Sequence, residues 1–272
     1  HVNTHVKLDM WRFKRNITII DIKLSMVKQI LLILIMFCVL DANEIKVVFS
    51  YSTPPYVFGE DRGVAISIVR EALQYKSHTL KPVFISVGRR IEMFKHGYVD
   101  AIPIVKNDSG PGAYYSDFFI RHHSAAFALN SRCCDIKNVE DLKNYRVIAF
   151  QNAQKNLGQA FANVVKASSA NYSEVANQKQ QAYKLLENRV DAIVLDRHVF
   201  EFYKKELISQ GKVDEGVKVD IFDLFEPTQY RLAFQDENVR NDFNEGLRAI
   251  KKSGRYDEIY DNYSKQYFRM KI

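Results

Sequence analysis

Charged side chains directly follow two of the apolar, strand-like segments of this sequence. Asp196 comes after AIVL, where an ionised carboxylate can receive a cationic group through charge-assisted hydrogen bonds. The same residue can instead cap a helix that begins at Arg197. Arg89 and Arg90 come after LKPVFIS, where a guanidinium can bind a carboxylate in a bidentate manner or form a solvated first helical turn. These residue types and positions favour the binding of a small charged molecule.

Aromatic and amide side chains supply further candidates for such a binding site. Tyr51 and Tyr56 flank two prolines that stiffen the chain, and each ring can stack on a ligand or its cationic group, or pack locally. The other candidates share one position, immediately after a strand-like segment: Lys106, Asn107, Gln151 and Asn152. The predicted ligand-binding set is completed by Tyr51, Tyr56, Arg89 and Asp196.

Sequence motifs of covalent catalysis and of metal binding are absent. We find no nucleophile elbow, HExxH segment, phosphate loop or dinucleotide fingerprint. His122 and His123 are neighbours, so in a strand they point to opposite faces and cannot chelate one ion together. Cys133 and Cys134 lack the spacing of zinc ligands, and we expect them to be unbridged thiols. We therefore expect no enzymatic activity, no metal and no cofactor.

The composition is that of a globular protein. The chain has 272 residues, of which 47% are hydrophobic and 26% are charged. Its formal net charge is +7, but acidic and basic residues alternate along the chain, and no Lys/Arg run is interleaved with aromatic residues. Nucleic acid is therefore not an expected partner.

The N-terminal region contains a segment typical of a secretory signal. From Met26, the sequence MVKQILLILIMFCVLDA has one lysine followed by an uncharged apolar run, Ile30 to Leu40. This run is too short to span a bilayer, which takes about 20 residues, but it suits the apolar region of a signal peptide. We interpret 26–42 as a signal peptide and 1–25 as an upstream, non-native extension. An N-terminal membrane anchor is the alternative.

Hydrophobic periodicity predicts alternating strands and helices in two successive blocks. In the first, EIKVVFSY, LKPVFIS and AIPIV are predicted strands, separated by a helix over 64–75 and a short helix in RRIEMFKHG. In the second, YRVIAF, NYSEVA and AIVL are strands, with helices over 156–165, 178–187 and 197–208. Each βαβαβ block predicts a mostly parallel sheet with right-handed crossovers.

The tetrapeptide Val-Asp-Ala-Ile occurs once in each block, at 99–102 and at 190–193. Both copies mark the junction between a helix and the third strand, where we expect Asp100 and Asp191 to bond nearby backbone. Catalysis by either aspartate is disfavoured because they lie at the amino end of the strand. Ligands of open α/β sheets collect at the carboxyl ends.

Two extended segments connect the blocks. Residues 124–132 leave the first block and residues 217–234 return to it, after which apolar stripes predict two closing helices that pack on the first block. We therefore predict a two-lobed α/β fold joined by two crossover strands. Lobe 1 is expected at 43–128 and 226–272, and lobe 2 at 131–222.

Four segments have the order and spacing of a known protein family: YSTPPYVF, MFKHGYVDAIPI, LLENRVDAIVLDRHV and LRAIKKSGRYDEIYDNY. They resemble the corresponding segments of the family 3 extracellular solute-binding proteins. That family has the type II periplasmic-binding-protein fold and serves ABC importers of polar amino acids. The resemblance extends over residues 45–267, which is nearly all of the chain after the predicted signal.

The resemblance implies roles for individual residues, and it also exposes differences. In the amino-acid binders an Asp at the position of Asp196 meets the ligand ammonium group, and an Arg at the position of Ser109 meets its carboxylate. The family's Gly-Thr-Thr segment corresponds to residues 152–154, whose backbone amides can still bind an anion. The aromatic residue of the family's first loop corresponds to Thr53. We therefore expect a ligand other than a standard α-amino acid.

The sequence thus predicts a periplasmic, monomeric solute-binding protein. Its two lobes would close by hinge bending on a small polar solute, and an ABC importer permease would recognise the closed form. One alternative is a sensory module that presents the closed form to a membrane receptor. A second is a dehydratase-like periplasmic enzyme on the same fold, with Asp196 or Asp108 as general acid and base.

Overall fold

The computed structural model describes residues 43–50, 53–59, 61–104 and 112–268. The predicted signal peptide 26–42 and the extension 1–25 lie outside these ranges. The first block has the elements that the periodicity predicts: β1 (Glu44–Phe49), α2 (Val64–Gln74), β2 (Thr79–Phe84), the 3-10 turn η1 (Val87–Arg89), α3 (Arg90–Lys95) and β3 (Ala101–Ile104). Within the described ranges, no helix is both long enough and apolar enough to cross a membrane.

The second block repeats this order of strands and helices. Its elements are β6 (Ser124–Leu129), η2 (Asn130–Arg132), η3 (Val139–Asn144), β7 (Val147–Phe150), α4 (Ala153–Asn156), α5 (Gln159–Ala167), η4 (Ser169–Asn171), β8 (Tyr172–Val175), α6 (Gln178–Leu186), β9 (Ala192–Asp196), α7 (Arg197–Ser209) and β10 (Val219–Phe222). One prediction was wrong in detail, because the helix expected over 156–165 is divided into α4 and α5. Between them Gly158 has a φ of 90°, which interrupts the helical backbone.

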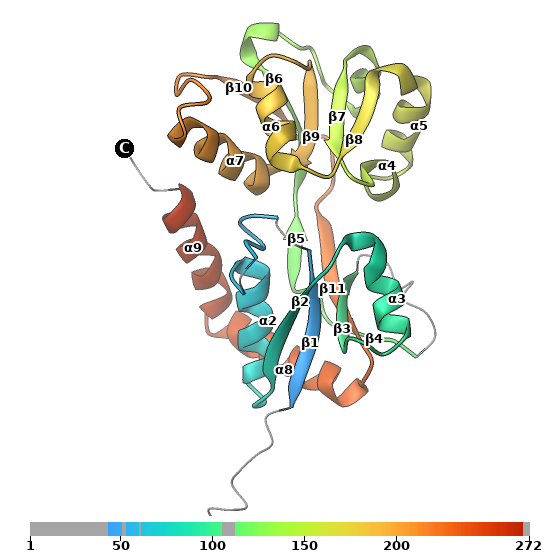
Figure 1. Cartoon of the computed structure of the whole chain (residues 1–272), viewed down its shortest axis with the longest axis vertical. Coiled ribbons are helices and arrows are strands. Elements are labelled where there is room, and N and C mark those ends of the chain that lie inside the picture. Colours follow the sequence, from blue (N-terminus) through green and yellow to red (C-terminus); the bar gives the residue numbers. More distant parts are fainter. Residues whose placement is uncertain (1–42, 51–52, 60, 105–111, 269–272) are drawn as a thin grey trace, which may run out of the picture. The chain divides into compact units, whose positions relative to one another are not determined.

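Two mixed sheets form the centres of the two lobes (Figure 1). The first has the strand order β2-β1-β3-β11-β4, with β5 paired to β11; here β4 is Tyr114–Tyr115, β5 is Ile120–His122 and β11 is Thr228–Phe234. The second has the order β10-β6-β9-β7-β8. β1 is parallel to β2 and β3, and β7 is parallel to β8 and β9, whereas β6, β10 and β11 pair antiparallel with their neighbours. The two-lobed α/β prediction is confirmed, although both sheets are less parallel than expected.

The chain passes between the sheets twice, from β5 into β6 and from β10 into β11. The sequence places residues 124–128 in lobe 1, but β6 pairs with β9 and β10 of the second sheet. The end of the first lobe therefore lies earlier than expected, before Ser124. The strands that follow the two crossings, β6 and β11, run antiparallel to their partners, which explains why the sheets are mixed.

The repeated Val-Asp-Ala-Ile segment ties the third strand of each block to the first. The Asp100 carboxylate accepts a hydrogen bond from the backbone amide of Lys46 at 2.7 Å, and the Asp191 carboxylate accepts one from the amide of Arg146 at 2.8 Å. Asp191 also pairs with the guanidinium groups of Arg132 and Arg146. The side-chain hydrogen bond from Arg146 holds the pKa of Asp191 below its usual range. Both aspartates thus bond nearby backbone, as the sequence predicts.

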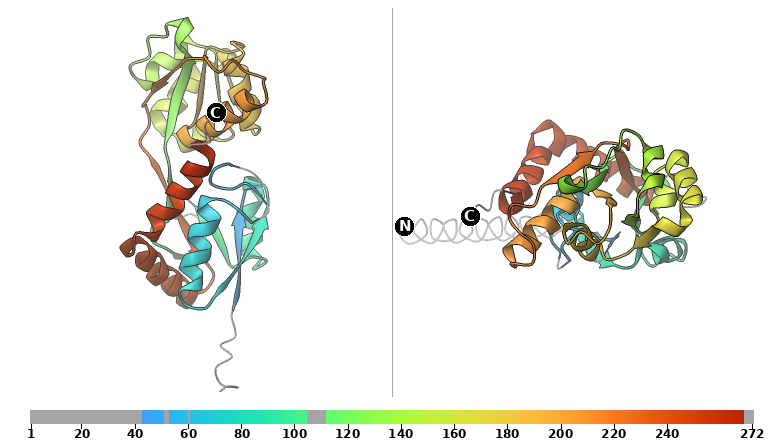
Figure 2. Two further views of the ribbon diagram at one scale, coloured as in Figure 1. Left: turned by 90° about the vertical axis from the view of Figure 1, so that its left-hand side faces the viewer. Right: turned by 90° about the horizontal axis from the view of Figure 1, so that it is seen from above.

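Three helices pack against one another beside the first sheet: α2, α8 (Glu237–Lys252) and α9 (Arg255–Phe268) (Figures 1 and 2). Gly246 of α8 lies so close to α2 that a Cβ atom there would stand 1.9 Å from the carbonyl oxygen of Ala72. The Tyr263 hydroxyl of α9 accepts a hydrogen bond from the amide of Gly63, immediately before α2, at 2.9 Å. The C-terminal helices therefore fix the position of the chain between β1 and α2.

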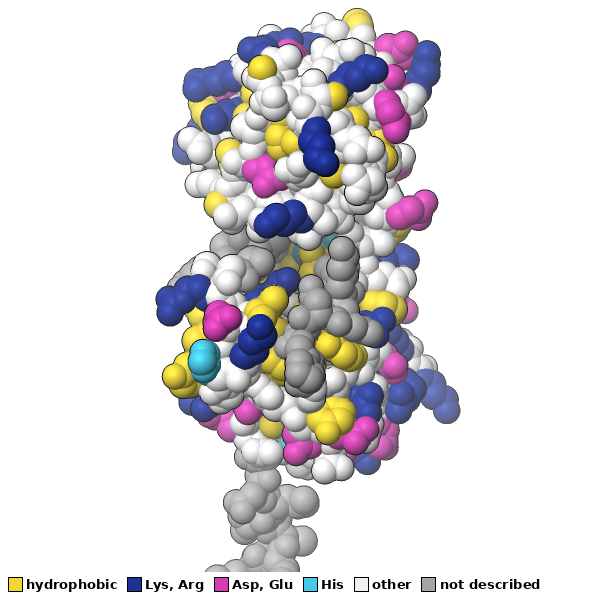
Figure 3. All heavy atoms as spheres, turned by 90° about the vertical axis from the view of Figure 1, so that its right-hand side faces the viewer, with side chains coloured by type: hydrophobic (Ala, Val, Ile, Leu, Met, Phe, Trp, Pro, Cys, Tyr) yellow, Lys and Arg dark blue, Asp and Glu magenta, His cyan; other side chains and the backbone are white. Residues whose placement is uncertain are grey.

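The charged side chains are dispersed over the surface. On the face shown in Figure 3, Lys and Arg side chains lie among Asp and Glu side chains and do not form one continuous patch. Several basic residues of the first lobe form ion pairs, such as Lys76 with Glu245 and Arg248 with Asp117. This is the solvated surface that the alternating charges of the sequence predict.

Candidate functional site

Tyr56 and Asp196 join the two lobes by a direct hydrogen bond. Tyr56 is a buried residue of the segment that connects β1 to α2, and Asp196 is the buried last residue of β9. The Tyr56 hydroxyl donates to the Asp196 carboxylate and lies 3.2 Å from each of its oxygens. Burial, followed by the charge of Asp196, raises the pKa of Tyr56 well above its usual value. The hydroxyl therefore stays protonated, and remains a donor, throughout the neutral range.

Backbone amides supply the other hydrogen bonds to the Asp196 carboxylate. The amides of His198 and Val199 donate to Oδ1 at 2.9 and 3.1 Å, and the amide of His123 donates to Oδ2 at 2.8 Å. Asp196 is thus the N-cap of α7, the structural alternative that the sequence leaves open. Because its side chain is also covered by Tyr56, a cationic solute would reach this carboxylate only by replacing the Tyr56 hydroxyl.

Two histidine rings border this pair. His122 of β5 stacks on the Tyr56 ring with ring centroids 4.0 Å apart. The centroid of its ring also lies 4.9 Å from that of Tyr230 of β11. The Nδ1 atom of His198 lies 3.2 Å from the Tyr56 hydroxyl. Burial lowers the pKa of His122 and so favours the neutral ring. We call Tyr56, His122, Asp196 and His198 the inter-lobe cluster.

The His123 side chain pairs with Asp223, whereas its backbone amide bonds Asp196 of the inter-lobe cluster. Its Nε2 atom lies 3.5 Å from Asp223. Cys133 and Cys134 are free thiols. No group of three or more His, Cys, Asp or Glu side chains in the described part of the chain is arranged to hold a metal ion.

The loop after β7 is bonded to a carboxylate of the chain itself. Asn152 has a left-handed backbone with a φ of 66° and immediately precedes α4. The Glu174 carboxylate of β8 accepts hydrogen bonds from the amide of Asn152 at 2.6 Å, the amide of Gln154 at 2.9 Å and the hydroxyl of Tyr172 at 2.8 Å. The Asn152 and Gln154 amides belong to the segment 152–154 that was predicted to bind an anion of the ligand. In the structure they bond the carboxylate of Glu174 instead.

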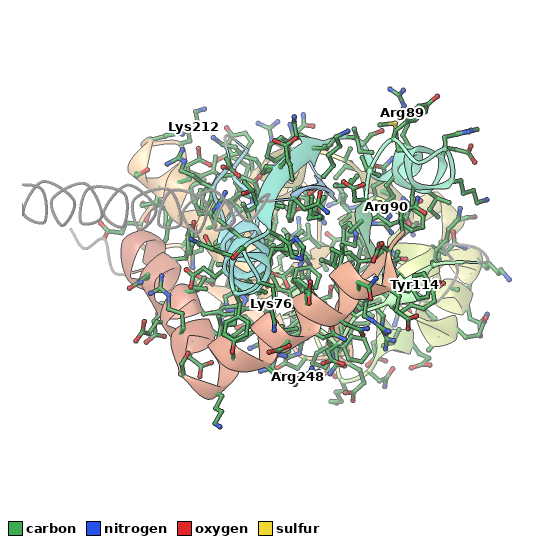
Figure 4. The ribbon with its side chains drawn as sticks, turned by 90° about the horizontal axis from the view of Figure 1, so that it is seen from below. Lys76, Arg89, Arg90, Tyr114, Lys212 and Arg248 are labelled. Atoms are coloured by element: carbon green, nitrogen blue, oxygen red, sulfur yellow. The ribbon has the colours of Figure 1, made fainter. Side chains whose placement is uncertain are left out.

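Of the two neighbouring arginines, Arg90 lies further into the molecule than Arg89 (Figure 4). Arg89 is exposed at the end of η1, and its side chain has no hydrogen-bond or ion-pair partner among the described residues. Arg90 is half-buried and stands close enough to Tyr230 to act on its titration. Burial raises the pKa of Tyr230, and the charge of Arg90 opposes that rise. Arg90 is thus the arginine of this pair whose charge acts on Tyr230, although the sequence prediction named Arg89.

The predicted ligand-binding residues do not all come together. Tyr56 and Asp196 are in contact, Asn152 belongs to the separate loop that Glu174 closes, and Gln151 is exposed beside it. The following residues lie outside the described ranges: Tyr51, Lys106, Asn107, Asp108 and Ser109. A pocket of about 330 Å³ on the second lobe is lined by none of the predicted residues; its walls are Asn177, Lys179, Gln180, Tyr183, Leu207 and Lys212.

Solved structures of ligand-binding proteins share this arrangement of elements. An ancestral arginine-binding protein bound to arginine matches with a TM-score of 0.64 at 22% identity, covering 81% of this chain and 98% of that one. The GluR0 ligand-binding core from Nostoc punctiforme in complex with L-glutamate matches with a TM-score of 0.61 at 21% identity, covering 80% and 98%. The chain has the type II periplasmic-binding-protein fold. No family model and no curated protein sequence matches it.

A histidine kinase sensor domain with similarity to periplasmic binding proteins is also similar to this chain. That domain matches with a TM-score of 0.64 at 17% identity, covering 82% of this chain and 97% of its own. The fold expected from the four resembling segments is thereby confirmed.

Four residues that make hydrogen bonds or ring contacts in this region were not predicted as site residues: Tyr172, Glu174, His198 and Tyr230. One sequence signal was available for Glu174, which is a charged residue inside the predicted strand NYSEVA. Tyr172 bonds Glu174 two residues away, but the other partners of Glu174, His198 and Tyr230 are distant in the sequence. The tertiary fold, which periodicity does not specify, brings those partners together.

Proposed function

We propose that this chain is an extracytoplasmic solute-binding protein that captures a small polar solute between its two lobes. The observation that carries the proposal is the likeness, over nearly the whole length of the other proteins, to structures that hold arginine and L-glutamate. The placement of polar side chains supports it further. Glu174, Gln151 and Asp196 lie at or near the carboxyl ends of β8, β7 and β9, where open α/β sheets bind ligands.

Capture would proceed by hinge bending at the two crossings between the sheets. A solute that entered between Tyr56 and Asp196 would exchange the tyrosine hydroxyl for a donor of its own. A charge that leaves water must be paired, so both lobes have to contribute partners. We propose Arg90, whose charge acts on Tyr230 beside His122, as a basic group of lobe 1, in addition to the residues proposed from the sequence.

The compartment and the recipient are further parts of the proposal. Residues 26–42 would direct the chain to the periplasm, and an ABC importer permease would recognise the closed form of the monomer. Both parts rest on the sequence pattern of the signal and on the four segments that resemble solute-binding proteins.

Titration calorimetry of the purified protein against amino acids, amines and other small polar solutes tests solute binding. We expect one chemical class to bind with a Kd of about 1 μM or tighter, equivalent to about −8 kcal/mol, and to raise the Tm. Mass spectrometry of small molecules released by denaturing freshly purified protein would identify a co-purified solute. A correctly folded protein that binds none of these solutes would contradict the proposal.

Sensing is the second candidate function, favoured by the likeness to a histidine kinase sensor domain. The closed form would then act on a membrane receptor. Deleting the gene separates the two candidates. Loss of uptake of the labelled solute indicates transport, whereas normal uptake with a lost cellular response to the solute indicates sensing. Turnover of a bound solute, followed by NMR, would instead indicate an enzyme.

A further inference from the structure

The Glu174 carboxylate occupies backbone amides that the resemblance assigns to a ligand anion. We propose that Glu174 is a built-in anion that excludes a ligand carboxylate from lobe 2, so that the solutes of this chain are organic amines without a carboxylate. This inference rests on the proposed solute-binding function and specifies its substrate class.

Both oxygens of Glu174 are engaged by donors. Oε2 accepts from the Asn152 amide, and Oε1 accepts from the Gln154 amide and the Tyr172 hydroxyl. The group only accepts, as an ionised carboxylate does. Hydrogen bonds of this charge-assisted kind are about twice as strong as neutral ones. A ligand carboxylate would therefore have to displace a group that already satisfies these amides.

A second carboxylate beside Glu174 would also be repelled by it. Glu174 is half-buried, so two like charges there would be screened less than in bulk water. Like charges that share a site disfavour the ionised form of both groups. The loop after β7 therefore rejects the chemical group that its amides would otherwise receive.

The carboxyl edge of the second sheet carries negative charge without a Lys or Arg partner. Among the described residues, Glu174 has no ion pair, and Asp196 has only the His198 ring, whose Nδ1 atom is 4.0 Å away. Three other partly buried carboxylates of the described chain do have such a partner: Glu71 with Arg255, Asp191 with Arg146, and Glu206 with Lys179. A cationic ligand would supply the missing positive charge at this edge.

Glu174 and Asp196 belong to the same face of the sheet. The strand register pairs Glu174 with Ala149 of β7, and Ala149 with Val194 of β9. Asp196 follows Val194 by two residues, and alternate residues of a strand share a face. With β7 between them, β8 and β9 stand about 10 Å apart. An alkyl chain with a positive group at one or both ends suits two such carboxylates better than a zwitterion does.

Amines and the amino acids that differ from them by one carboxylate are the matched probes for this inference. The pairs are putrescine with ornithine, cadaverine with lysine, agmatine with arginine, and histamine with histidine. Titration calorimetry of the full-length purified protein gives a Kd for each compound. We expect at least one amine to bind about ten-fold or more tightly than its amino acid, a difference of about 1.4 kcal/mol.

Glu174→Ala removes the built-in anion and frees two amides. The preference for the amine should then fall about ten-fold or more, because the amino acid gains donors while the amine loses an attractive charge. Glu174→Gln keeps the size of the side chain, and its NH₂ group cannot accept from an amide, so the preference for the amine should fall in this variant too. It provides the test if Glu174→Ala does not fold. Glu215→Ala is the control, since it removes one negative charge from an exposed residue of the same lobe.

Three results would overturn the inference. The wild-type protein binds an amino acid as tightly as its amine, Glu174→Ala leaves the preference equal to that of Glu215→Ala, or the protein binds only solutes of another class. In each of these cases the solute-binding function itself still stands. If no compound of the broad panel binds to folded wild-type protein, the proposed function fails, and the inference fails with it.

Discussion

The Tyr56 hydroxyl lies 3.2 Å from both carboxylate oxygens of Asp196, although the two residues are 140 positions apart and belong to different lobes. Each residue was predicted for the site independently. Their contact means that the carboxylate expected to meet a ligand cation already has a protein donor. A cation that bound Asp196 would therefore have to displace this contact between the lobes.

Tyr56→Phe tests the contribution of this hydrogen bond. The variant keeps the ring that stacks on His122 and removes only the hydroxyl, while three backbone amides continue to satisfy Asp196. We expect the free energy of unfolding to fall by about 1.5–3 kcal/mol, the range for a hydrogen bond to a charged acceptor. Urea unfolding measures the loss. The exposed Tyr98→Phe serves as the control and should change stability by less than about 0.5 kcal/mol.

The pKa of His122 predicts how stability depends on pH. Burial lowers the pKa in the folded state, so below the unfolded value of about 6.5 the unfolded chain binds the proton more readily. The contribution of neutral His122 to the free energy of unfolding is therefore fully present above that pH, and stability falls as the pH is lowered through it. The charge of Asp196 opposes this shift, and that of a protonated His198 adds to it.

Unfolding free energies of His122→Phe, measured between pH 7.5 and 5, check this expectation. The phenyl ring keeps the stacking on Tyr56 and cannot take up a proton, so the pH dependence should be shallower than in the wild type. His96→Phe, at an exposed histidine, should keep the wild-type slope. An equal slope for the wild type and His122→Phe would show that His122 is not the group responsible.

Hydrophobic periodicity was sufficient to predict most of the fold. The strands and helices of both blocks alternate as expected, because each buries one apolar stripe or face. The repeated Asp100 and Asp191 were correctly expected to bond backbone, since their position before a strand limits what they can reach. The break at Gly158 was missed because the apolar stripe continues across it, whereas the backbone does not.

The candidate site was predicted less completely, for a physical reason. Glu174 reaches the amides of Asn152 and Gln154 only because β8 pairs with β7 in one particular register. Sequence patterns give the face on which a residue lies, but they do not give the neighbouring strand. For Asp196 the sequence could name two roles, and only the geometry shows that the N-cap role is in use.

Asp191→Asn is expected to destabilise the second lobe without changing solute affinity. It weakens the bonds from Arg132 and Arg146, and the lost charge-assisted hydrogen bonds correspond to about 1–3 kcal/mol at pH 7. Because the folded pKa of Asp191 is lowered, this stabilisation is present above the unfolded value of about 3.9 and is lost as the pH falls through the folded pKa. The wild type and the variant should therefore converge in strongly acidic urea titrations. Asp135→Asn, at an exposed ion pair, is the control.

Gly246→Ala is expected to disrupt the packing of α8 on α2. The new methyl group would lie 1.9 Å from the backbone oxygen of Ala72, and backbone cannot move aside as a side chain can. We expect a loss of about 3 kcal/mol or more, at the upper end of overpacking effects. Gly88→Ala is the matched control, since a Cβ atom there would meet no atom within 4 Å. Similar thermal stabilities of the two variants would mean that α2 and α8 are less closely packed than described.

Asp196→Asn and Asp196→Ala together separate the cap of α7 from the charge of the site. Asparagine is as good an N-cap as aspartate, so Asp196→Asn should retain the bonds from His198 and Val199. Its NH₂ group cannot accept from the His123 amide, so the variant should still lose about 1–3 kcal/mol. Asp196→Ala loses the same acceptor and should lose about 1–2 kcal/mol more through the missing cap. If a solute cation binds Asp196, both variants should weaken that solute by about 2–5 kcal/mol, the cost of breaking a buried charge pair.

Asp236 provides a matched control, because it caps α8 in the same way through the amides of Asn238 and Val239. Asp236→Ala should lower stability by about 1–2 kcal/mol, the cost of a missing cap, and leave the solute Kd unchanged. Calorimetry and urea unfolding on the same preparations give both quantities. If Asp196→Asn binds the solute as tightly as the wild type, Asp196 is a helix cap alone, and the cation must be held by other residues.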